Sequence, residues 1–382
     1  MNIFQKIKKW IKSLFCKEEK VIELLPFKPY LWDMERLEDV KEHHPELVEQ
    51  VIFMANQYIP QPPEYDCPPP VMITDKPKVF IEDTHEYVSL APYFWENPDT
   101  VGGIPWIERD GEVNPNAQFY DLHRLEALID KLRWLSLAYY FTGDERYYKF
   151  AVEQINVWFI NQETRMYPKM EYCQIAIGHN DNKGINTFES YYFIQVFEAI
   201  ALLNQYSPFA NDFTYKLKLW LRDFIKFIET SKQGQFENSM ENNHGIMYDT
   251  GLIYFKILAD GKLDKKLVKR LYGRIKSQIK EDGSQPEELK RNRAYHYSVY
   301  NLDHMIDAVD IIEGAGMEVD MDILILISDA VKFLARFSKD SFHNSGYTEI
   351  GDWAACDDYF IRTAYRMGFG SYDLLTKDYM TL

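Results

Sequence analysis

Long apolar runs are absent from this sequence, and none approaches the ~20 residues that a membrane-spanning helix needs. A recognisable signal peptide is also absent, because lysines interrupt each apolar stretch of residues 1–20 and no small-residue cleavage site follows. These absences favour a cytoplasmic or a peripherally membrane-associated protein.

Cysteine is scarce, and the four cysteines lie far apart without a CxxC pair or another metal-binding spacing. This pattern disfavours both a disulfide framework and a zinc site. We expect no metal and four free thiols, at Cys16, Cys67, Cys173 and Cys356.

Basic residues are outnumbered, with 43 lysines and arginines against 59 acidic residues and a net charge of −16. Such a charge opposes nonspecific binding to nucleic acid or other polyanions. A protein of this charge that handles an anionic substrate must therefore concentrate its cations locally. The 27 tyrosines and 8 tryptophans suit a groove that stacks sugar rings as well as they suit a packed core.

The N-terminal 80 residues differ from the rest of the chain. Residues 1–20 place an apolar stripe opposite lysines, which is typical of a basic amphipathic helix. Such a helix can contact an anionic membrane through residues 1–16, or it can dock on the protein or form a loosely ordered terminus. Residues 21–80 are expected to form an N-terminal arm that ends in a proline-rich extended connection.

From residue 121 onward, apolar residues recur every three or four positions, which predicts a helical body spanning residues 81–382. Short breaks such as Thr142-Gly143-Asp144, Ser207-Pro208 and Asp260-Gly261 predict antiparallel helical hairpins. A row of hairpins buries both apolar faces when it curls into a ring, so we expect an all-α fold of the α/α toroid type. The expected helices are 121–141, 145–160, 186–205, 211–230, 244–259, 263–281, 295–314, 320–338 and 356–367.

Asn242, Asn243 and His244 stand where a polar stretch, residues 234–243, gives way to a helix. A helix N-terminus with two amides and an imidazole can bind an anion such as a sugar carboxylate. The alternative is structural: one asparagine caps the helix, and His244 satisfies a backbone group.

Residues 282–298 form a second polar segment, rich in charge and tyrosine. If residues 293–300 are helical, Arg293, Tyr297 and Tyr300 share one face, which sets a cation beside phenols. Nearby positive charge is what makes a tyrosine usable as a base. Alternatively, the basic residues form a solvated face and the tyrosines pack in the core.

Three loops combine aromatic residues with Asn, His and Gly, as sugar subsites often do. They are residues 89–95, which include Tyr93 and Trp95, residues 111–115, and residues 178–184, which include His179 and Asn180. Ordinary packed loops have the same composition.

Taken together, these stretches resemble the alginate lyase family. The Asn-Asn-His element and the later Asp-Gly-Ser-x-Pro-x-Glu-Leu-x-Arg element leading to His-Tyr are similar to the central signature of that family. The upstream Ser-Leu-Ala-Pro-Tyr-Phe-Trp, Asp-Gly-Glu-Val-Asn-Pro and Tyr-Phe-Thr-Gly-Asp stretches look like its alginate-lyase-like branch, and the likeness covers residues 80–355.

The resemblance implies an α/α toroid that cleaves an anionic, uronate-containing polysaccharide by β-elimination, with no obligatory cofactor. It implies that Asn243, His244 and Arg291 neutralise the C5 carboxylate and that Tyr297 protonates the departing oxygen. Either His244 or Tyr297 would be the base. Arg293 is the alternative arginine, because the spacing from Arg291 to Tyr297 is one residue shorter than the family pattern. The residues expected to bind substrate are Asn242, Arg293, Tyr300, Tyr93, Trp95, His179 and Asn180.

Two other functions fit the same composition. A glycoside hydrolase would need two opposed carboxylates, such as Asp121 or Asp352 with Glu287. A noncatalytic glycan-binding protein would keep the fold and lose the chemistry.

Overall fold

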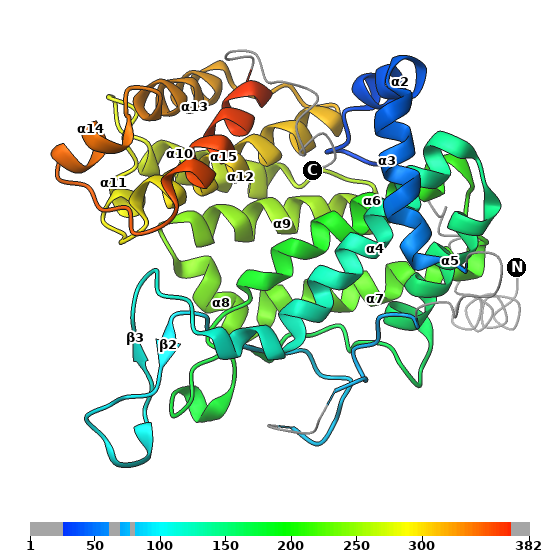
Figure 1. Cartoon of the computed structure of the whole chain (residues 1–382), viewed down its shortest axis with the longest axis horizontal. Helices are drawn as coiled ribbons and strands as arrows, with labels where there is room; N and C mark the ends of the chain where they lie inside the picture. Colours follow the sequence, from blue (N-terminus) through cyan, green and yellow to red (C-terminus); the bar gives the residue numbers. More distant parts are fainter. Residues whose placement is uncertain (1–25, 61–68, 77–80, 368–382) are drawn as a thin grey trace, which may run out of the picture.

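The structure is a computed structural model, and it describes residues 26–60, 69–76 and 81–367 (Figure 1). The expected amphipathic helix of residues 1–20 and its membrane contact, together with Cys16 and Cys67, lie outside the described residues. The other two cysteines, Cys173 and Cys356, are free and buried, as expected. In the described ranges, no helix combines the length and the apolar character needed to cross a membrane.

The chain is mostly helical, and the helices expected from residue 121 onward are present (Figure 1). The long helices are α4 (Asp121–Thr142), α5 (Glu145–Ile155), α6 (Phe193–Tyr206), α7 (Asn211–Thr230), α9 (Asn243–Asp260), α10 (Lys265–Gln278), α12 (Ala294–Gly314), α13 (Met321–Leu334) and α15 (Trp353–Arg366). Shorter helices are α2 (Met34–His43), α3 (Pro45–Ala55), α8 (Lys232–Ser239), α11 (Pro286–Leu289) and α14 (Lys339–Asn344).

Two of the three predicted breaks end helices through glycines. Gly143 ends α4 with a φ of 66°, and Gly261 ends α9 with a φ of 67°. Both values fall in the left-handed region, which glycine enters without the steric penalty of a Cβ atom. The aspartates that follow, Asp144 and Asp264, cap the next helices through their side chains. The chain therefore reverses direction at both breaks.

The packing arranges the helices in two layers. Helices α4, α6, α9 and α12 contact one another in the order α4–α6–α9–α12, while α5, α7, α10 and α13 each flank one of them. In Figure 1, α9, α6 and α4 run through the middle of the molecule, with α12 and α13 beyond α9. The contacts form one large apolar core, in which rings such as Phe159 and Trp220 pack with centroids 4.7 Å apart. Many of the aromatic residues therefore serve ordinary packing.

The N-terminal arm contains two helices, α2 and α3, that the sequence analysis did not predict. Asp33 caps α2, and Pro45 begins α3, so ordinary start signals were present there. Helix α3 packs on α4. The backbone N–H groups of Tyr30 and Leu31 donate to the buried carboxylate of Glu198 on α6, which ties the arm to the body.

Helix α8 corrects a second expectation, because residues 234–243 were expected to be a polar stretch without a helix. Ser231 caps α8 through the backbone N–H of Gly234. A Cβ atom on Gly234 would lie 1.8 Å from the carbonyl oxygen of Ile228. Glycine is usually unfavourable in a helix, but Gly234 is needed here because α8 begins so close to the end of α7.

The loops expected around residues 89–95 and 178–184 contain or adjoin short strands. Strand β1 (Val88–Leu90) pairs in parallel with β4 (Tyr172–Ile175), and β2 (Phe94–Trp95) pairs antiparallel with β3 (Ile107–Glu108). Figure 1 shows the β2–β3 hairpin projecting from the helical body. Strands this short carry too little periodicity to be predicted.

Two expected helices are also modified at one end. The helix predicted for residues 145–160 continues past α5 as a π-helical turn, Asn156–Ile160. The helix predicted for residues 186–205 begins with a 3₁₀ turn, Phe188–Tyr192, that precedes α6. This 3₁₀ turn places Phe188 and Tyr192 beside the site described below.

Candidate active site

The Asn-Asn-His element forms the elbow between α8 and α9. Asn242 is the N-cap of α9, and its side chain accepts the backbone N–H of His244 at 3.2 Å. The capping role considered from the sequence is therefore real for Asn242. Gly245 follows because a Cβ atom there would lie 2.3 Å from the Met240 carbonyl oxygen and 2.5 Å from Nη1 of Arg274.

Asn243 is fully buried and forms two hydrogen bonds with Glu288 of α11. The backbone N–H of Asn243 donates to Oε1 of Glu288 at 2.7 Å, and Nδ2 donates to Oε2 at 2.8 Å. Burial raises the pKa of Glu288, while the two donors of Asn243 oppose that rise. Oδ1 of Asn243 is buried and has no partner among the described residues. Glu288 thus joins the Asn-Asn-His element to the second polar segment.

The imidazole of His244 is hydrogen-bonded to Glu237 of α8. Its Nδ1 lies 2.8 Å from Oε1 of Glu237, and its ring packs on Phe188 with centroids 4.7 Å apart. Nε2 has no hydrogen-bond partner among the residues that the structure describes. Burial disfavours the imidazolium, but the charges of Glu237 and Glu288 outweigh it, so the pKa of His244 is raised.

Tyr297, near the start of α12, stands against a guanidinium and a second phenol. Cζ of Arg291 lies 3.8 Å from the centre of the Tyr297 ring, and the Tyr297 hydroxyl shares a hydrogen bond with the hydroxyl of Tyr93. Burial and Tyr93 raise the pKa of Tyr297, and Arg291 opposes that rise. The phenol is therefore protonated at neutral pH.

Arg291 is fixed by Asp110, from the loop after β3. Nε and Nη2 of Arg291 donate to Oδ1 of Asp110 at 3.0 and 2.6 Å, while Oδ2 accepts the backbone N–H of Asn292 at 2.9 Å. The guanidinium lowers the pKa of Asp110 against the effect of burial, so the pair is ionic. The guanidinium of Arg291 is thereby held over the ring of Tyr297.

An aromatic bridge joins the two halves of the site. The ring of Phe188 contacts His244 and stacks on Tyr300, with centroids 6.3 Å apart in the second pair. Tyr300 in turn meets Tyr297 edge-to-face at 6.4 Å, and its hydroxyl lies 3.3 Å from that of Tyr192. The two motifs, which lie far apart in the sequence, therefore meet around one site.

The arginine named as an alternative has different contacts. Nε of Arg293 lies 3.8 Å from Oε1 of Glu349, in the loop that precedes α15. Arg291 is the residue whose guanidinium lies on the Tyr297 ring. Arg293 instead joins the start of α12 to that loop, where its backbone also bridges Glu349.

The remaining residues expected to bind substrate lie on the β2–β3 hairpin and the loop beside it. Nε1 of Trp95 donates to the Glu112 carbonyl at 2.9 Å, and Cζ of Arg109 lies 5.2 Å from the Trp95 ring centre. His179 packs edge-to-face on Phe94, its Nε2 lies 2.7 Å from the Trp106 carbonyl oxygen, and Asn180 bonds within its own loop. These contacts order the hairpin, and Tyr93 at its base is the residue that reaches Tyr297.

Sequence reasoning missed the residues that hold the site together. Glu288 and Asp110 lie within motifs that the sequence analysis quoted. An acidic residue in these motifs could have been proposed as a partner of the predicted cation Arg291. Glu237 and Phe188 gave no such signal, because α8 and the 3₁₀ turn were not predicted.

Three acidic or imidazole side chains further along α12, Asp303, His304 and Asp307, are close enough together to hold a metal ion. Arg366 of α15 already donates to Asp303 at 2.8 Å and to Asp307 at 2.6 Å. A guanidinium thus takes the place that a cation would take between these carboxylates.

The carboxylates nominated for a hydrolase have structural partners. Asp121 is buried and accepts from Lys76, Arg124 and the backbone of Val88. Asp352 caps α15. Glu287 is exposed and pairs with Lys290 at 2.6 Å.

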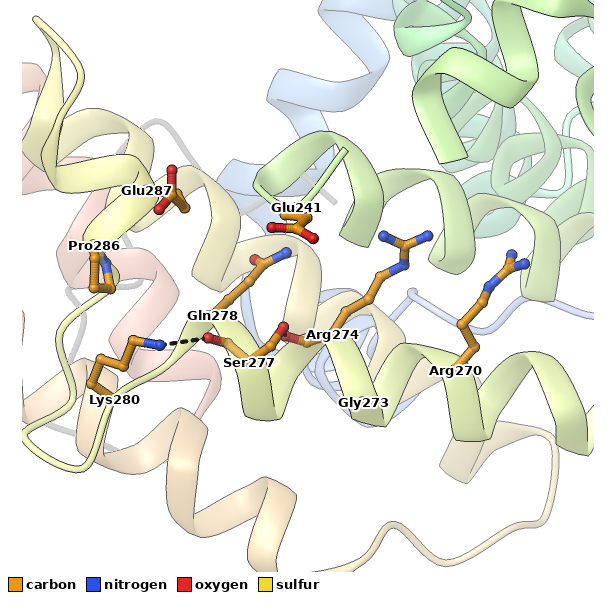
Figure 2. A pocket seen from close by; sticks show the side chains of 9 residues that line it. All are labelled: Glu241, Arg270, Gly273, Arg274, Ser277, Gln278, Lys280, Pro286 and Glu287. Atoms are coloured by element: carbon orange, nitrogen blue, oxygen red, sulfur yellow. Dashed lines mark hydrogen bonds between the residues drawn. The ribbon is translucent and has the colours of Figure 1, made fainter. Parts of the chain in front are cut away.

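A pocket of about 390 Å³ lies on the α10 side of the α8–α9 elbow (Figure 2). Its lining includes Glu241, Arg274, Gln278 and Glu287, and Nε2 of Gln278 donates to the Asn242 carbonyl at 3.0 Å. None of Asn243, His244, Arg291 and Tyr297 lines it. The pocket therefore lies behind the candidate site and includes none of these four residues.

Comparison with solved structures finds the same architecture in alginate lyases. An alginate lyase from Bacteroides ovatus has a TM-score of 0.79 and 27% identity, covering 90% of this chain and 92% of its own. Alginate lyase A1-III from Sphingomonas species A1 has a TM-score of 0.55 and 16% identity, covering 92% of this chain and 91% of its own. A variant of A1-III complexed with tetrasaccharide has a TM-score of 0.58 and 16% identity, covering 92% and 90%.

A comparison with curated protein sequences gave no match. The alginate lyase family itself matches residues 73–342, which is most of the chain and includes both halves of the site. The chain therefore belongs to the alginate lyase family and is a polysaccharide lyase.

Proposed function

We propose that this lyase cleaves alginate or a related polyuronate by β-elimination at the site formed by Asn243, His244, Arg291 and Tyr297. The observation that carries the proposal is the meeting of the two motifs. Glu288 of the second motif binds Asn243 of the first, and Arg291 lies on the Tyr297 ring. Phe188 and Tyr300 bridge His244 to Tyr297. Family membership supports the reaction, and the complex of a similar lyase with a tetrasaccharide supports a polymeric sugar substrate.

The proposed fold is an α/α toroid. Helices α4, α6, α9 and α12 would form the inner layer and α5, α7, α10 and α13 the outer layer, in keeping with their contacts. Asn243 and Tyr297 both stand in the first turns of inner helices, α9 and α12. This arrangement would put the catalytic groups at one end of the ring, on a catalytic domain of residues 81–382.

In the proposed reaction, Arg291 and Asn243 donate to the carboxylate on C5 of the uronate. Neutralising that carboxylate makes the C5 proton more acidic, because the negative charge that develops next to C5 meets preorganised donors. The base removes the C5 proton, the electron pair forms the C4–C5 double bond, and the C4–O glycosidic bond breaks. Tyr297 donates its proton to the departing oxygen.

We assign the base to His244. A donor hydrogen on Nδ1 facing Glu237 leaves the lone pair on Nε2, which has no hydrogen-bond partner in the described part of the chain and can accept a proton. A raised imidazole pKa also makes the neutral His244 ring a stronger base. Tyr297 suits the opposite task, since burial keeps its phenol protonated.

A substrate screen tests the proposal directly. Purified protein is incubated with alginate, polymannuronate, polyguluronate and glucuronan, and the ultraviolet absorbance of the unsaturated product is followed. Elimination creates a conjugated double bond, whereas hydrolysis creates reducing ends without it. Absorbance that rises with at least one polymer supports the proposal, and reducing ends that appear without absorbance contradict it.

A further inference from the structure

We propose that Glu237 is a positioning residue for catalysis: it fixes the ring orientation and the tautomer of His244 without touching the substrate. The inference rests on the proposed function and deepens it. It concerns a residue of α8, a helix that separates the polar elbow from α7 and that carries no other group of the site.

The contact between Glu237 and His244 is short and enclosed. Only 2% of the Glu237 side chain is exposed, against 21% of the His244 side chain. Oε1 of Glu237 lies 2.8 Å from Nδ1 of His244, and Oε2 is buried without a partner among the described residues. A carboxylate buried this deeply costs free energy unless it is paired, and the imidazole is the partner it faces.

The rest of the fold holds this contact in place. From α10, Arg274 donates to the carbonyl oxygens of Met240 at 2.8 Å and Asn238 at 2.7 Å, and its Nε donates to the fully buried Asp249 at 2.8 Å. Figure 2 shows Arg274 rising from α10 toward the segment that carries Glu241. The elbow is therefore clamped just after Glu237.

Gly245 completes the clamp. Any side chain there would collide with the Met240 carbonyl oxygen and with Arg274. The close approach of the first turn of α9 to the end of α8 is what brings His244 against Glu237. The geometry is thus set by the close approach of the two backbones together with the Arg274 side chain.

The chemical consequence is a carboxylate–imidazole pair of the kind that orients catalytic histidines. Glu237 accepts the hydrogen on Nδ1, so the lone pair of neutral His244 lies on Nε2. Its negative charge also favours the imidazolium that forms when His244 removes the C5 proton. Asn243, the neighbour of His244, is oriented independently by Glu288.

The test replaces Glu237 by glutamine and reads His244 in two ways. In ¹⁵N-histidine nuclear magnetic resonance titrations of the full chain, we expect the Glu237→Gln variant to lower the pKa of His244 by about one unit or more. In assays on the preferred polyuronate, we expect kcat to fall at least about tenfold, since a hydrogen bond to a charged group is lost. KM should change less, because Glu237 does not touch the substrate.

The pH profile of kcat/KM gives a readout that a purely structural role would not move. Its acidic limb should shift to lower pH in Glu237→Gln, in step with the titration of His244. The matched control is Glu241→Gln, which removes the same charge from an exposed residue of the same segment and should leave both readouts unchanged. If Glu237→Gln does not fold, Glu237→Asp keeps the charge and should retain most of the pKa shift while lowering kcat.

An unchanged His244 titration in Glu237→Gln would overturn the inference, and so would a variant with wild-type kcat and pH profile. An equal effect of Glu241→Gln would overturn it too, because long-range charge would then explain the result. The magnetic resonance readout needs no substrate. A wild-type protein that degrades no polyuronate would refute the proposed function while leaving the Glu237–His244 contact measurable.

Discussion

Replacing Glu288 by glutamine probes the joint between the two motifs of the site. Both oxygens of Glu288 accept from Asn243, one from the backbone N–H at 2.7 Å and one from Nδ2 at 2.8 Å. A glutamine at position 288 keeps one acceptor oxygen, which can still receive the backbone N–H of Asn243. Its NH₂ group replaces the other oxygen, so two donors, this group and Nδ2 of Asn243, would face each other. The Asn243 side chain must then flip, so that its Oδ1 accepts from the new amide and Nδ2 turns away.

The magnitude follows from the two hydrogen bonds and the buried charge. Exchanging bonds to a charged group, worth roughly 1.5–3 kcal/mol each, for neutral ones worth about 0.5–1.5 kcal/mol costs about 2–3 kcal/mol. Glutamine also removes the desolvation penalty that raises the pKa of Glu288, which offsets part of that loss. We expect the free energy of unfolding to fall by no more than about 2 kcal/mol. We expect kcat to fall at least about tenfold, since residue 288 no longer holds the Asn243 amide in its wild-type orientation.

Chemical denaturation and steady-state kinetics measure the two effects separately. Glu287→Gln is the matched control, because Glu287 is exposed and pairs only with a surface lysine, so both quantities should stay at wild-type values. A Glu288→Gln variant with wild-type kcat would refute the reasoning. Loss of activity in Glu287→Gln would instead favour a hydrolase.

Two further predictions concern arginines and pH. Arg291→Lys should lower kcat at least about tenfold, because lysine cannot both pair with Asp110 through two nitrogens and cover the Tyr297 ring. Arg293→Lys should chiefly lower the melting temperature, and activity that depends on Arg293 alone would contradict this. Burial raises the pKa of Glu198 to about 7, so its stabilising contribution is full below about pH 4.5 and is lost as pH rises toward and through 7. Wild type should lose about 2–3 kcal/mol of unfolding free energy between about pH 5 and pH 8, and a Glu198→Gln variant with the same loss would contradict that assignment.

The sequence predicted the helical body well because its signals are local. Periodic apolar residues mark α4, α9 and α12, and the glycines that end α4 and α9 need left-handed backbone that other residues avoid. The helices of the N-terminal arm had comparable start signals, which the many prolines nearby obscured. Helix α8 was missed because Gly234 reads as a helix breaker unless its contact with α7 is known.

The sequence supplied the candidate catalytic residues but not the residues that hold them in place. Asn243, His244, Arg291 and Tyr297 were named from the resemblance to the alginate lyase family, whereas Glu237 and Phe188 join the site through contacts that no spacing encodes. The choice between Arg291 and Arg293 likewise depended on tertiary structure. The two arginines are only two residues apart, but they have different partners. Arg291 pairs with Asp110 and Arg293 with Glu349, and these acidic residues come from separate loops.

The central claim is that Tyr297 donates a proton at a site that Asn243, His244 and Arg291 have prepared. The most direct test compares wild type and Tyr297→Phe on the polyuronate that wild type degrades fastest, with polymer binding measured by calorimetry. We expect kcat to fall at least about 100-fold, the usual contribution of a positioned acid, with binding and helical circular dichroism retained. A Tyr297→Phe enzyme that forms the unsaturated product at the wild-type rate would contradict the account.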